Sequence, residues 1–186
     1  RFGRKRKYAL GKTSGKANIK NNLDELGIKL SDKELKMVTS KVIELGDKKE
    51  RVTIEDLPYI INDVLDYPEK NNKIIIDSYV LTSAKTLKPS TALSMIIKDK
   101  LYQETASGDG QFDAFMNALK SIYQSINLKL PKLIDYSVRI PPGSDSDALC
   151  ETTITWDSGK KKFKTRGLDS DQTVAAIKAT EKMLNV

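Results

Sequence analysis

The first third of the chain has hydrophobic residues at helical spacing, which predicts three short helices. The first covers 16–25, and the second opens at Ser31, which forms a capping-box pattern with Glu34. The third opens at Thr53, and Gly46 and Pro68 are the expected ends of the second and third helices. The hydrophobic positions that share a helix face are Ile19, Leu23 and Leu26, then Leu35, Val38, Val42 and Leu45, then Leu57, Ile60, Ile61, Val64 and Leu65. So small a helical part has little core of its own, and we expect it to dock on another part of the protein.

From residue 74 onward the pattern changes to strands, and the same order of elements occurs twice. Three strands and a helix are predicted at 74–84, 91–97, 101–106 and 111–126, and again at 133–140, 149–156, 161–165 and 170–184. Neither half has two layers of its own, so the two βββα units should pair. The predicted fold is therefore α/β in the α+β sense, with a small helical subdomain followed by two tandem βββα units in two layers. The expected divisions are a basic arm at 1–15, the helical subdomain at 16–67, a linker at 68–73 and the paired units at 74–186.

Composition narrows the classes of function. The chain has no histidine, which excludes His-based catalytic triads and zinc sites. The net charge of +7 comes from the first twenty residues, which carry eight basic side chains and no acidic one. Such an arm is typical of nucleic-acid binding or of a solvated linker, and the shortage of aromatic residues for base stacking favours the linker. We therefore expect no nucleic-acid partner.

Two further features concern the compartment. The single cysteine, Cys150, lies in an alternating hydrophobic run and is expected to be a small buried side chain. One thiol cannot form an internal disulfide, and no hydrophobic run approaches the roughly 20 residues that span a bilayer. These features predict a cytoplasmic protein without a membrane partner.

Two glycine-containing segments, 108–110 and 167–169, directly precede predicted helices. The first N–H groups of a helix are unsatisfied and the helix dipole is positive there, so such a helix start can bind a carboxylate. Equally, glycine is a common way for a strand to turn into a helix. The loop 141–147 with Asp145 and Asp147 could receive an ammonium group, or it could be a plain surface loop. The residues alone thus favour a two-layer binding module over a catalytic domain.

A series of motifs resembles the region that follows the barrel of α-isopropylmalate synthases and citramalate synthases. Gly11-Lys12-Thr13-Ser14-Gly15 resembles the family's Gly-Lys-His-Ser-Gly, with Thr13 in place of His. The segments 30–35 and 52–57 match its helical linker. A third motif is similar to the family's Gly-Asp-Gly-Pro-Val-Asp-Ala: it reads Gly108-Asp109-Gly110-Gln111-Phe112-Asp113-Ala114, with Gln111 in place of Pro. Segments 133–138, 143–148 and 169–176 resemble three later elements, so the resemblance covers nearly the whole chain in order.

The resemblance implies a regulatory region of a homodimeric enzyme whose catalytic barrel lies outside this sequence. In that family the barrel uses a divalent metal to condense acetyl-CoA with an α-keto acid, so we expect neither catalytic residues nor a cofactor or metal in this chain. The end-product amino acid binds where the regulatory domains pair and inhibits the enzyme. The positions that match the family's effector site are Gly110, Phe112, Asp113, Leu133, Tyr136, Ile140, Ser146 and Ala148, and less strongly Ala175 and Ile177.

Leucine is the expected effector if the parent is a 2-isopropylmalate synthase, and isoleucine if it is a citramalate synthase. The two differ by the placement of one methyl group, which residue types alone do not resolve. A generic amino-acid-binding module of the ACT type is an alternative that predicts the order βαββαβ. A nucleic-acid-binding protein and a stand-alone enzyme are the other two alternatives.

Overall fold

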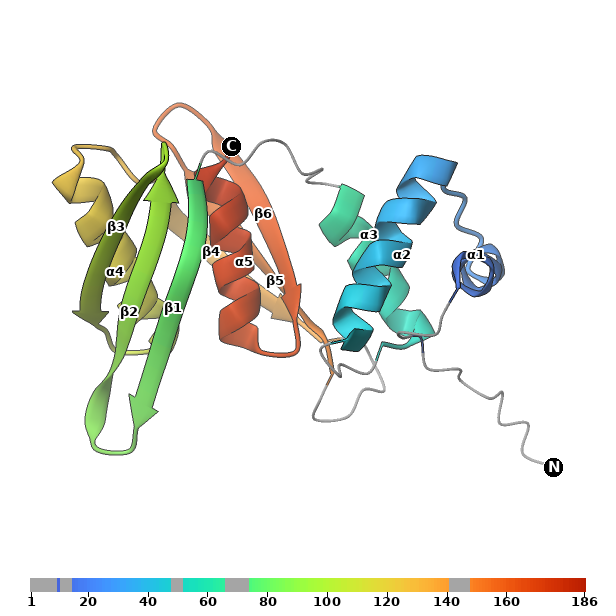
Figure 1. Cartoon of the computed structure of the whole chain (residues 1–186), viewed down its shortest axis with the longest axis horizontal. Helices are drawn as coiled ribbons and strands as arrows, with labels where there is room; N and C mark the ends of the chain where they lie inside the picture. The colour runs from blue at the N-terminus through green and yellow to red at the C-terminus, as the bar shows by residue number, and fades with distance from the viewer. Residues whose placement is uncertain (1–9, 11–14, 48–51, 66–73, 141–147) are drawn as a thin grey trace. The chain divides into compact units, whose positions relative to one another are not determined.

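The computed structural model describes Leu10 and residues 15–47, 52–65, 74–140 and 148–186 (Figure 1). The chain divides into two compact units. The helical unit holds the N-terminal helices with Val138–Glu151 and Leu168–Gln172, and the two-sheet unit holds Glu69–Ser137, Thr152–Gly167 and Thr173–Val186. The expected linker at 68–73 lies outside the described residues, and the boundaries drawn from the sequence stay predictions.

The helical unit contains the three predicted helices: α1 (Lys16–Glu25), α2 (Asp32–Asp47) and α3 (Leu57–Leu65), the last preceded by the short 3-10 helix η1 (Ile54–Asp56). The capping box of α2 is confirmed, because the Ser31 N–H donates to the Glu34 carboxylate at 2.7 Å. The hydrogen bond from the Ser31 hydroxyl, and after it the one from the Ser31 N–H, lowers the pKa of Glu34. The prediction that Gly46 ends this helix is wrong, since α2 continues to Asp47. A helical glycine costs only about 1 kcal/mol, which the buried stripe of α2 offsets.

The core of the helical unit is one hydrophobic cluster. The predicted α2 stripe is buried throughout, with Val38, Val42 and Leu45 fully inaccessible. Leu149 and Leu168, which come from the later part of the chain, belong to the same cluster. The helices therefore complete their core with residues from outside the helical segment, as their small size predicts.

The two-sheet unit contains two three-stranded sheets in the orders β1-β2-β3 and β4-β5-β6. The strands are β1 (Ile74–Ala84), β2 (Leu87–Ile97), β3 (Lys100–Ser107), β4 (Lys132–Arg139), β5 (Cys150–Asp157) and β6 (Lys162–Asp169), and the helices are α4 (Gln111–Ser125) and α5 (Gln172–Leu184). Each helix follows three strands, which confirms the two predicted βββα units and rules out the ACT order. In the first sheet α4 packs on β2 and β3.

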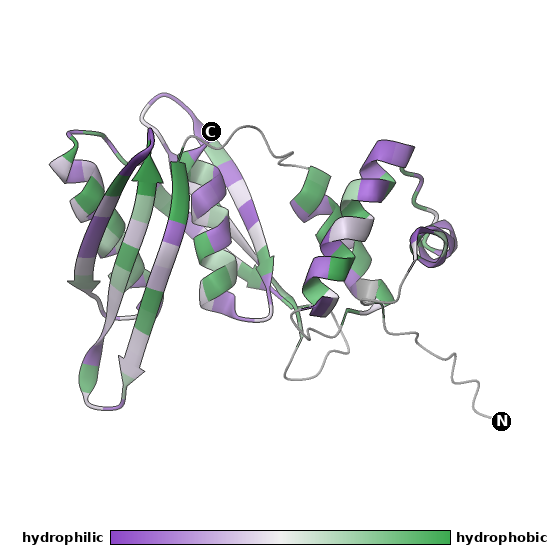
Figure 2. Ribbon diagram, in the orientation of Figure 1, coloured by the Kyte–Doolittle hydropathy of each residue, from purple (hydrophilic) through white to green (hydrophobic). Residues whose placement is uncertain are grey.

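One hydrophobic cluster joins both halves of the two-sheet unit. It contains Leu93 and Met95 from β2, Phe115 from α4, Trp156 from β5 and Ala179 from α5. The indole N–H of Trp156 donates to the Thr165 hydroxyl at 2.7 Å, which satisfies the one polar atom of this buried ring. Figure 2 shows the hydrophobic residues spread over both the sheets and the helices that share this core.

The second glycine segment differs from the prediction of a flexible helix start. Residues Gly167–Asp169 are part of β6, and α5 begins only at Gln172. Gly167 lies against the helix: a Cβ at this position would come within 2.7 Å of the Ala179 backbone nitrogen and closer still to the Ala175 carbonyl oxygen. Glycine is needed here because strand and helix backbones approach each other directly, a tertiary contact that local sequence does not reveal.

Tyr123 on α4 gives the two-sheet unit a measurable response to alkaline pH. The side chain is 5% exposed, and burial raises the pKa of its phenol to about 12 from the usual 10.0. Between these two values the folded state keeps the phenol proton that the unfolded state loses. The contribution of Tyr123 to the free energy of unfolding is therefore present below about pH 10 and is lost towards pH 12.

We expect the free energy of unfolding of the wild-type chain to fall by about 2 kcal/mol more than that of Tyr123→Phe between pH 9 and 12. Urea unfolding at stepped pH measures this difference, and the variant itself is the control for the lysines, which titrate in both proteins. Parallel curves for the two proteins would contradict the burial of the phenol.

Candidate functional site

The start of α4 is the most constrained candidate segment. The Gly108 N–H donates to the Pro89 carbonyl at 3.0 Å, and the Asp109 N–H donates to the Asp113 carboxylate at 3.0 Å. A Cβ on Gly108 would meet both the backbone and the carboxylate of Asp113 at 2.7 Å, so only glycine fits. Gly110 is the N-cap in an extended conformation, with no atom within 4 Å of where a Cβ would lie. The segment is therefore held rigidly while open space remains at Gly110.

Asp113 has its own set of partners at this helix start. Besides the Asp109 N–H, its Oδ2 accepts a hydrogen bond from the Asn117 amide at 3.4 Å, and the same amide donates to the Ser107 carbonyl at 3.1 Å. The carboxylate thus fixes the connection from β3 to α4. Asp113 remains exposed, so it can also face a ligand. Asn117 was not among the predicted site residues, and only its spacing of four from Asp113 hinted at this role.

Two predicted residues from different elements lie together here. The rings of Phe112 on α4 and Tyr136 on β4 have centroids 5.5 Å apart at an interplanar angle of 46°. Phe112 also stacks on Phe115 with centroids 6.1 Å apart, and Phe115 meets Tyr79 edge-on. Phe112 and Tyr136 are both half-buried, so they form an aromatic surface beside the α4 start that is anchored in the core and still partly open.

The starts of α4 and α5 also lie close together, although 62 residues separate their contacting side chains. The Thr173 hydroxyl lies 3.5 Å from Oε1 of Gln111. Gln111 is the position at which this chain departs from the proline of the resembled motif, and its amide supplies a polar link that proline cannot make. The repeat predicts two similar helix starts, but it does not predict that they meet.

The other predicted residues are more scattered. Leu133 is 41% exposed near the start of β4 and, by strand alternation, points away from the Tyr136 side. On α5, Ala175 and Ile177 are 0% and 3% exposed, which makes them core positions. Two predicted positions belong to the helical unit: Ile140, which is 62% exposed, and Ala148, which is half-buried. Ser146 and the rest of the loop 141–147 lie outside the described residues.

The α4 start can hold a small zwitterion. The first-turn N–H groups have no partner within the helix, so they can donate to a carboxylate. Asp113 offers an anionic oxygen for an ammonium group, and Phe112 with Tyr136 offers a surface for a hydrophobic side chain. Carboxylate, ammonium and hydrophobic side chain are the three parts of a free aliphatic amino acid.

Three other features lie away from the α4 start: the cysteine, groups of metal-ligand residues and membrane-spanning helices. Cys150 is buried, as predicted, and its thiol donates to the Asp169 carbonyl at 3.1 Å. Within the described ranges, no three His, Cys, Asp or Glu side chains are grouped as a metal site would need. Among the helices that the structure describes, none is long and hydrophobic enough to cross a membrane.

Two family models match the chain. Residues 51–186 match the LeuA allosteric (dimerisation) domain, and residues 1–50 match the homocitrate synthase post-HMGL domain-like family. The first match covers the two-sheet unit and α3, including the α4 start and Tyr136.

Curated relatives align with almost the entire chain. A putative (R)-citramalate synthase of Archaeoglobus fulgidus is 30% identical over 99% of this chain, which covers 37% of that relative. The 2-isopropylmalate synthases of Aquifex aeolicus and Prochlorococcus marinus are 29% and 31% identical over 96% of this chain, which covers 34% and 32% of them. The chain thus spans about a third of the length of the curated relatives that it matches.

Proposed function

Because this chain belongs to the LeuA allosteric (dimerisation) domain family, we propose that it is the feedback-regulatory region of a 2-isopropylmalate synthase and binds leucine. The observation that carries the proposal is the pairing of Phe112 with Tyr136 at the α4 start, two positions that the resemblance assigns to the family's effector site. The relatives are synthases in amino-acid biosynthesis, and an end product of such a pathway is a free amino acid of the kind this segment can hold.

We place the effector with its carboxylate at the N–H groups of the α4 first turn. Its ammonium group would face Asp113, and its side chain would lie on the aromatic pair. Among the remaining predicted positions of the two-sheet unit, Leu133 is exposed and stays a proposed contact of the paired chains, whereas Ala175 and Ile177 belong to the core. Leucine then inhibits by binding one conformation of the enzyme more tightly than another, because only differential affinity can shift such an equilibrium.

The parent activity is condensation of acetyl-CoA with an α-keto acid in the cytoplasm. It would reside in the part of the relatives that this chain does not cover, together with a divalent metal. On this proposal the present chain alone is inactive, and its own residues bind the effector and hold two copies together.

Isoleucine is the second candidate effector, favoured by the relative that is a putative citramalate synthase. Leucine and isoleucine differ in the carbon that carries one methyl group, and discrimination of that size is worth about 1–3 kcal/mol. The same site geometry can accommodate leucine or isoleucine, and the measured affinities for the two amino acids distinguish them.

Thermal unfolding in the presence of amino acids tests the proposal. A ligand that binds only the folded state stabilises it by about 2.7 kcal/mol at 100 times its dissociation constant. We expect leucine to raise the midpoint of unfolding in a concentration-dependent way. Isoleucine should give a smaller shift, and alanine, which lacks the hydrophobic branch, should give almost none. Equal small shifts for all three would contradict a specific effector site, and a larger shift with isoleucine would assign the chain to the citramalate branch.

A further inference from the structure

The connection from β3 to α4 contains a dipeptide whose covalent chemistry the proposed function does not use. Asp109-Gly110 is the only place in the sequence where glycine follows aspartate, and glycine nowhere follows asparagine. In such a pair the glycine nitrogen can attack the aspartate side chain, because glycine has no Cβ to hinder the approach. Whether this reaction occurs in a folded protein depends on how the local structure holds the two residues.

The peptide group that joins Asp109 to Gly110 is not tied to the rest of the fold. Among the residues that the structure describes, neither its C=O nor its N–H has a hydrogen-bond partner. The groups on either side are held: the Asp109 N–H donates to the Asp113 carboxylate at 3.0 Å, and the Gly110 C=O accepts from the Ala114 N–H at 2.9 Å. Apart from its chain neighbours, nothing lies within 4 Å of where a Cβ of Gly110 would be. The reacting peptide group can therefore rotate within a fixed frame, and there is room for a ring.

The Asp109 carboxylate is also held more loosely than two aspartates that precede serine. Its polar contact is an ion pair in which the Lys88 Nζ lies 3.1 Å from Oδ1, and the two side chains are 89% and 74% exposed. Such an exposed ion pair is weak. Asp157 and Asp169 instead accept backbone N–H hydrogen bonds on Oδ1, at 2.7 and 3.0 Å. Of these three aspartates, Asp109 is the one whose carboxyl group is free to turn towards the next nitrogen.

We propose that Asp109-Gly110 is a site of spontaneous isomerisation to isoaspartate. The Gly110 nitrogen attacks Cγ of the protonated Asp109 carboxyl group, a C–N bond forms, and the amide proton and the carboxyl hydroxyl leave as water. Water then opens the cyclic imide at one of its two carbonyl carbons. Breaking the bond from nitrogen to Cγ restores aspartate, whereas breaking the bond from nitrogen to the original main-chain carbonyl carbon leaves the chain running through Cγ. The sequence of steps releases and consumes one water and needs no other reactant.

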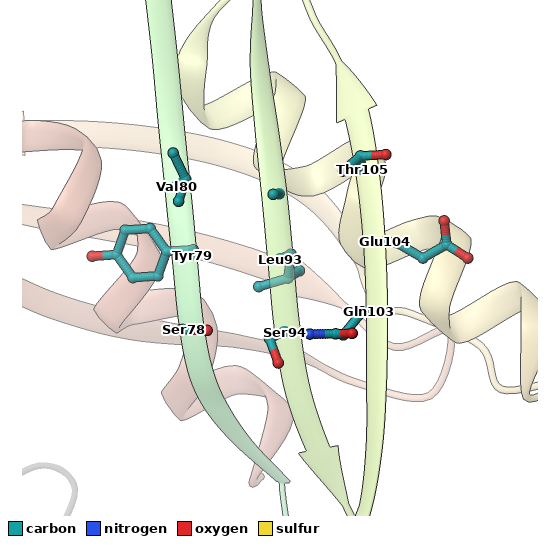
Figure 3. A pocket seen from close by; sticks show the side chains of 9 residues that line it. Ser78, Tyr79, Val80, Leu93, Ser94, Gln103, Glu104 and Thr105 are labelled. Carbon is teal, nitrogen blue, oxygen red and sulfur yellow. The ribbon is translucent and has the colours of Figure 1, made fainter.

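Isoaspartate would change the start of α4 and leave the first sheet intact. The main chain gains one methylene group directly before Gly110, which is the N-cap of α4. The hollow of about 400 Å³ in the first sheet is lined only by residues of β1, β2 and β3, so the change touches none of its lining (Figure 3). The proposed effector site uses the N–H groups of the α4 first turn, so the isomerised chain should lose leucine binding. This consequence rests on the proposed function, whereas the isomerisation itself does not.

Timed incubation of the full 186-residue chain at neutral pH tests the proposal. An isoaspartyl methyltransferase with labelled S-adenosylmethionine counts the isoaspartate that forms, and mass spectrometry of peptides locates it. We expect isoaspartate to accumulate at position 109 of the folded chain within about tenfold of the rate in urea, a barrier difference below about 1.4 kcal/mol. Asp157 and Asp169 should form none in the folded chain over the same period.

Asp109→Glu is the matched control, because it keeps a carboxylate beside Lys88 while its longer side chain does not readily form the cyclic imide. This variant should lose the signal at position 109. Gly110→Ala should lower the rate, because its methyl group hinders attack by the adjacent nitrogen and meets nothing else. A folded wild-type chain that forms no isoaspartate at position 109 while the chain in urea does would overturn the proposal. An unchanged signal in Asp109→Glu would overturn it as well.

Leucine titration of the fresh and the incubated chain separates this result from the proposed function. We expect the number of leucine sites to fall in step with the fraction of isoaspartate at position 109. Isomerisation without loss of leucine binding would contradict the placement of the effector at the α4 start. A fresh chain that does not bind leucine would contradict the sensor, and the isomerisation would still be decided by the methyltransferase measurement.

Discussion

Replacing Gly167 with alanine should destabilise the two-sheet unit by about 3 kcal/mol or more, near the upper end of the usual cost of overpacking. The added methyl group would lie within 2.7 Å of the Ala179 nitrogen and closer to the Ala175 carbonyl oxygen. Both are backbone atoms of α5, so no side-chain rotation relieves the clash, and the helix must move away from β6. Ala175, Ala176 and Ala179 are fully buried, so this movement would open the core.

Gly110→Ala is the matched control, because Gly110 precedes α4 in the other βββα unit. Its backbone is extended, and nothing lies within 4 Å of the position of an added methyl group. This variant should unfold within about 1 kcal/mol of wild type, since alanine is only a poorer helix N-cap than glycine. Urea unfolding followed by circular dichroism compares the two. Similar stabilities for Gly167→Ala and Gly110→Ala would show that α5 does not lie against β6 as described.

Tyr136→Ala should weaken leucine binding by about 100-fold, which corresponds to about 2.7 kcal/mol. Truncation removes one of the two rings that would contact the effector's side chain, and Phe112 loses its neighbour at 5.5 Å. Tyr136→Phe keeps the ring and should bind within a few-fold of wild type.

Tyr102→Ala provides the control for general loosening of the fold. Tyr102 lies on β3, is half-buried and packs against the same core, and the Lys100 ammonium stands 5.4 Å from its ring centroid. This variant removes a ring of the same size away from the α4 start. Calorimetric titration should show leucine affinity lost in Tyr136→Ala and kept in Tyr102→Ala. Equal losses in both would mean that the effector site lies elsewhere.

The order of elements could be predicted from the sequence because each signal is local. The stripe of Leu35, Val38, Val42 and Leu45 predicts α2, and the repeated strand patterns predict both βββα units. Lys98 and Asp99 lie between the predicted strands 91–97 and 101–106, and both adopt the positive φ of a hairpin turn, at 50° and 61°. Errors fall where a local signal competes with packing. At Gly46 the buried stripe carries the helix past the expected end, and at Gly167 a backbone contact with α5 explains the glycine.

The candidate site was predictable only in part. Phe112 and Tyr136 were named from motifs, and the structure brings them together. The approach of Gln111 to Thr173 and the bonds of Asn117 depend on tertiary geometry, which one sequence does not encode in a readable pattern. Ala175 and Ile177 were named as site residues from a motif, but both are buried in the core. A motif match alone does not distinguish a core residue from a residue that contacts a ligand.

The most direct test of the central proposal is calorimetric titration of the full chain with leucine, followed by isoleucine under the same conditions. The account predicts saturable binding of one leucine per chain, because each chain supplies one α4 start with its Phe112–Tyr136 pair. Isoleucine should bind about tenfold or more weakly, as the misplacement of one methyl group implies. Absence of saturable binding with both amino acids at millimolar concentration would contradict the assignment of this chain as an amino-acid sensor.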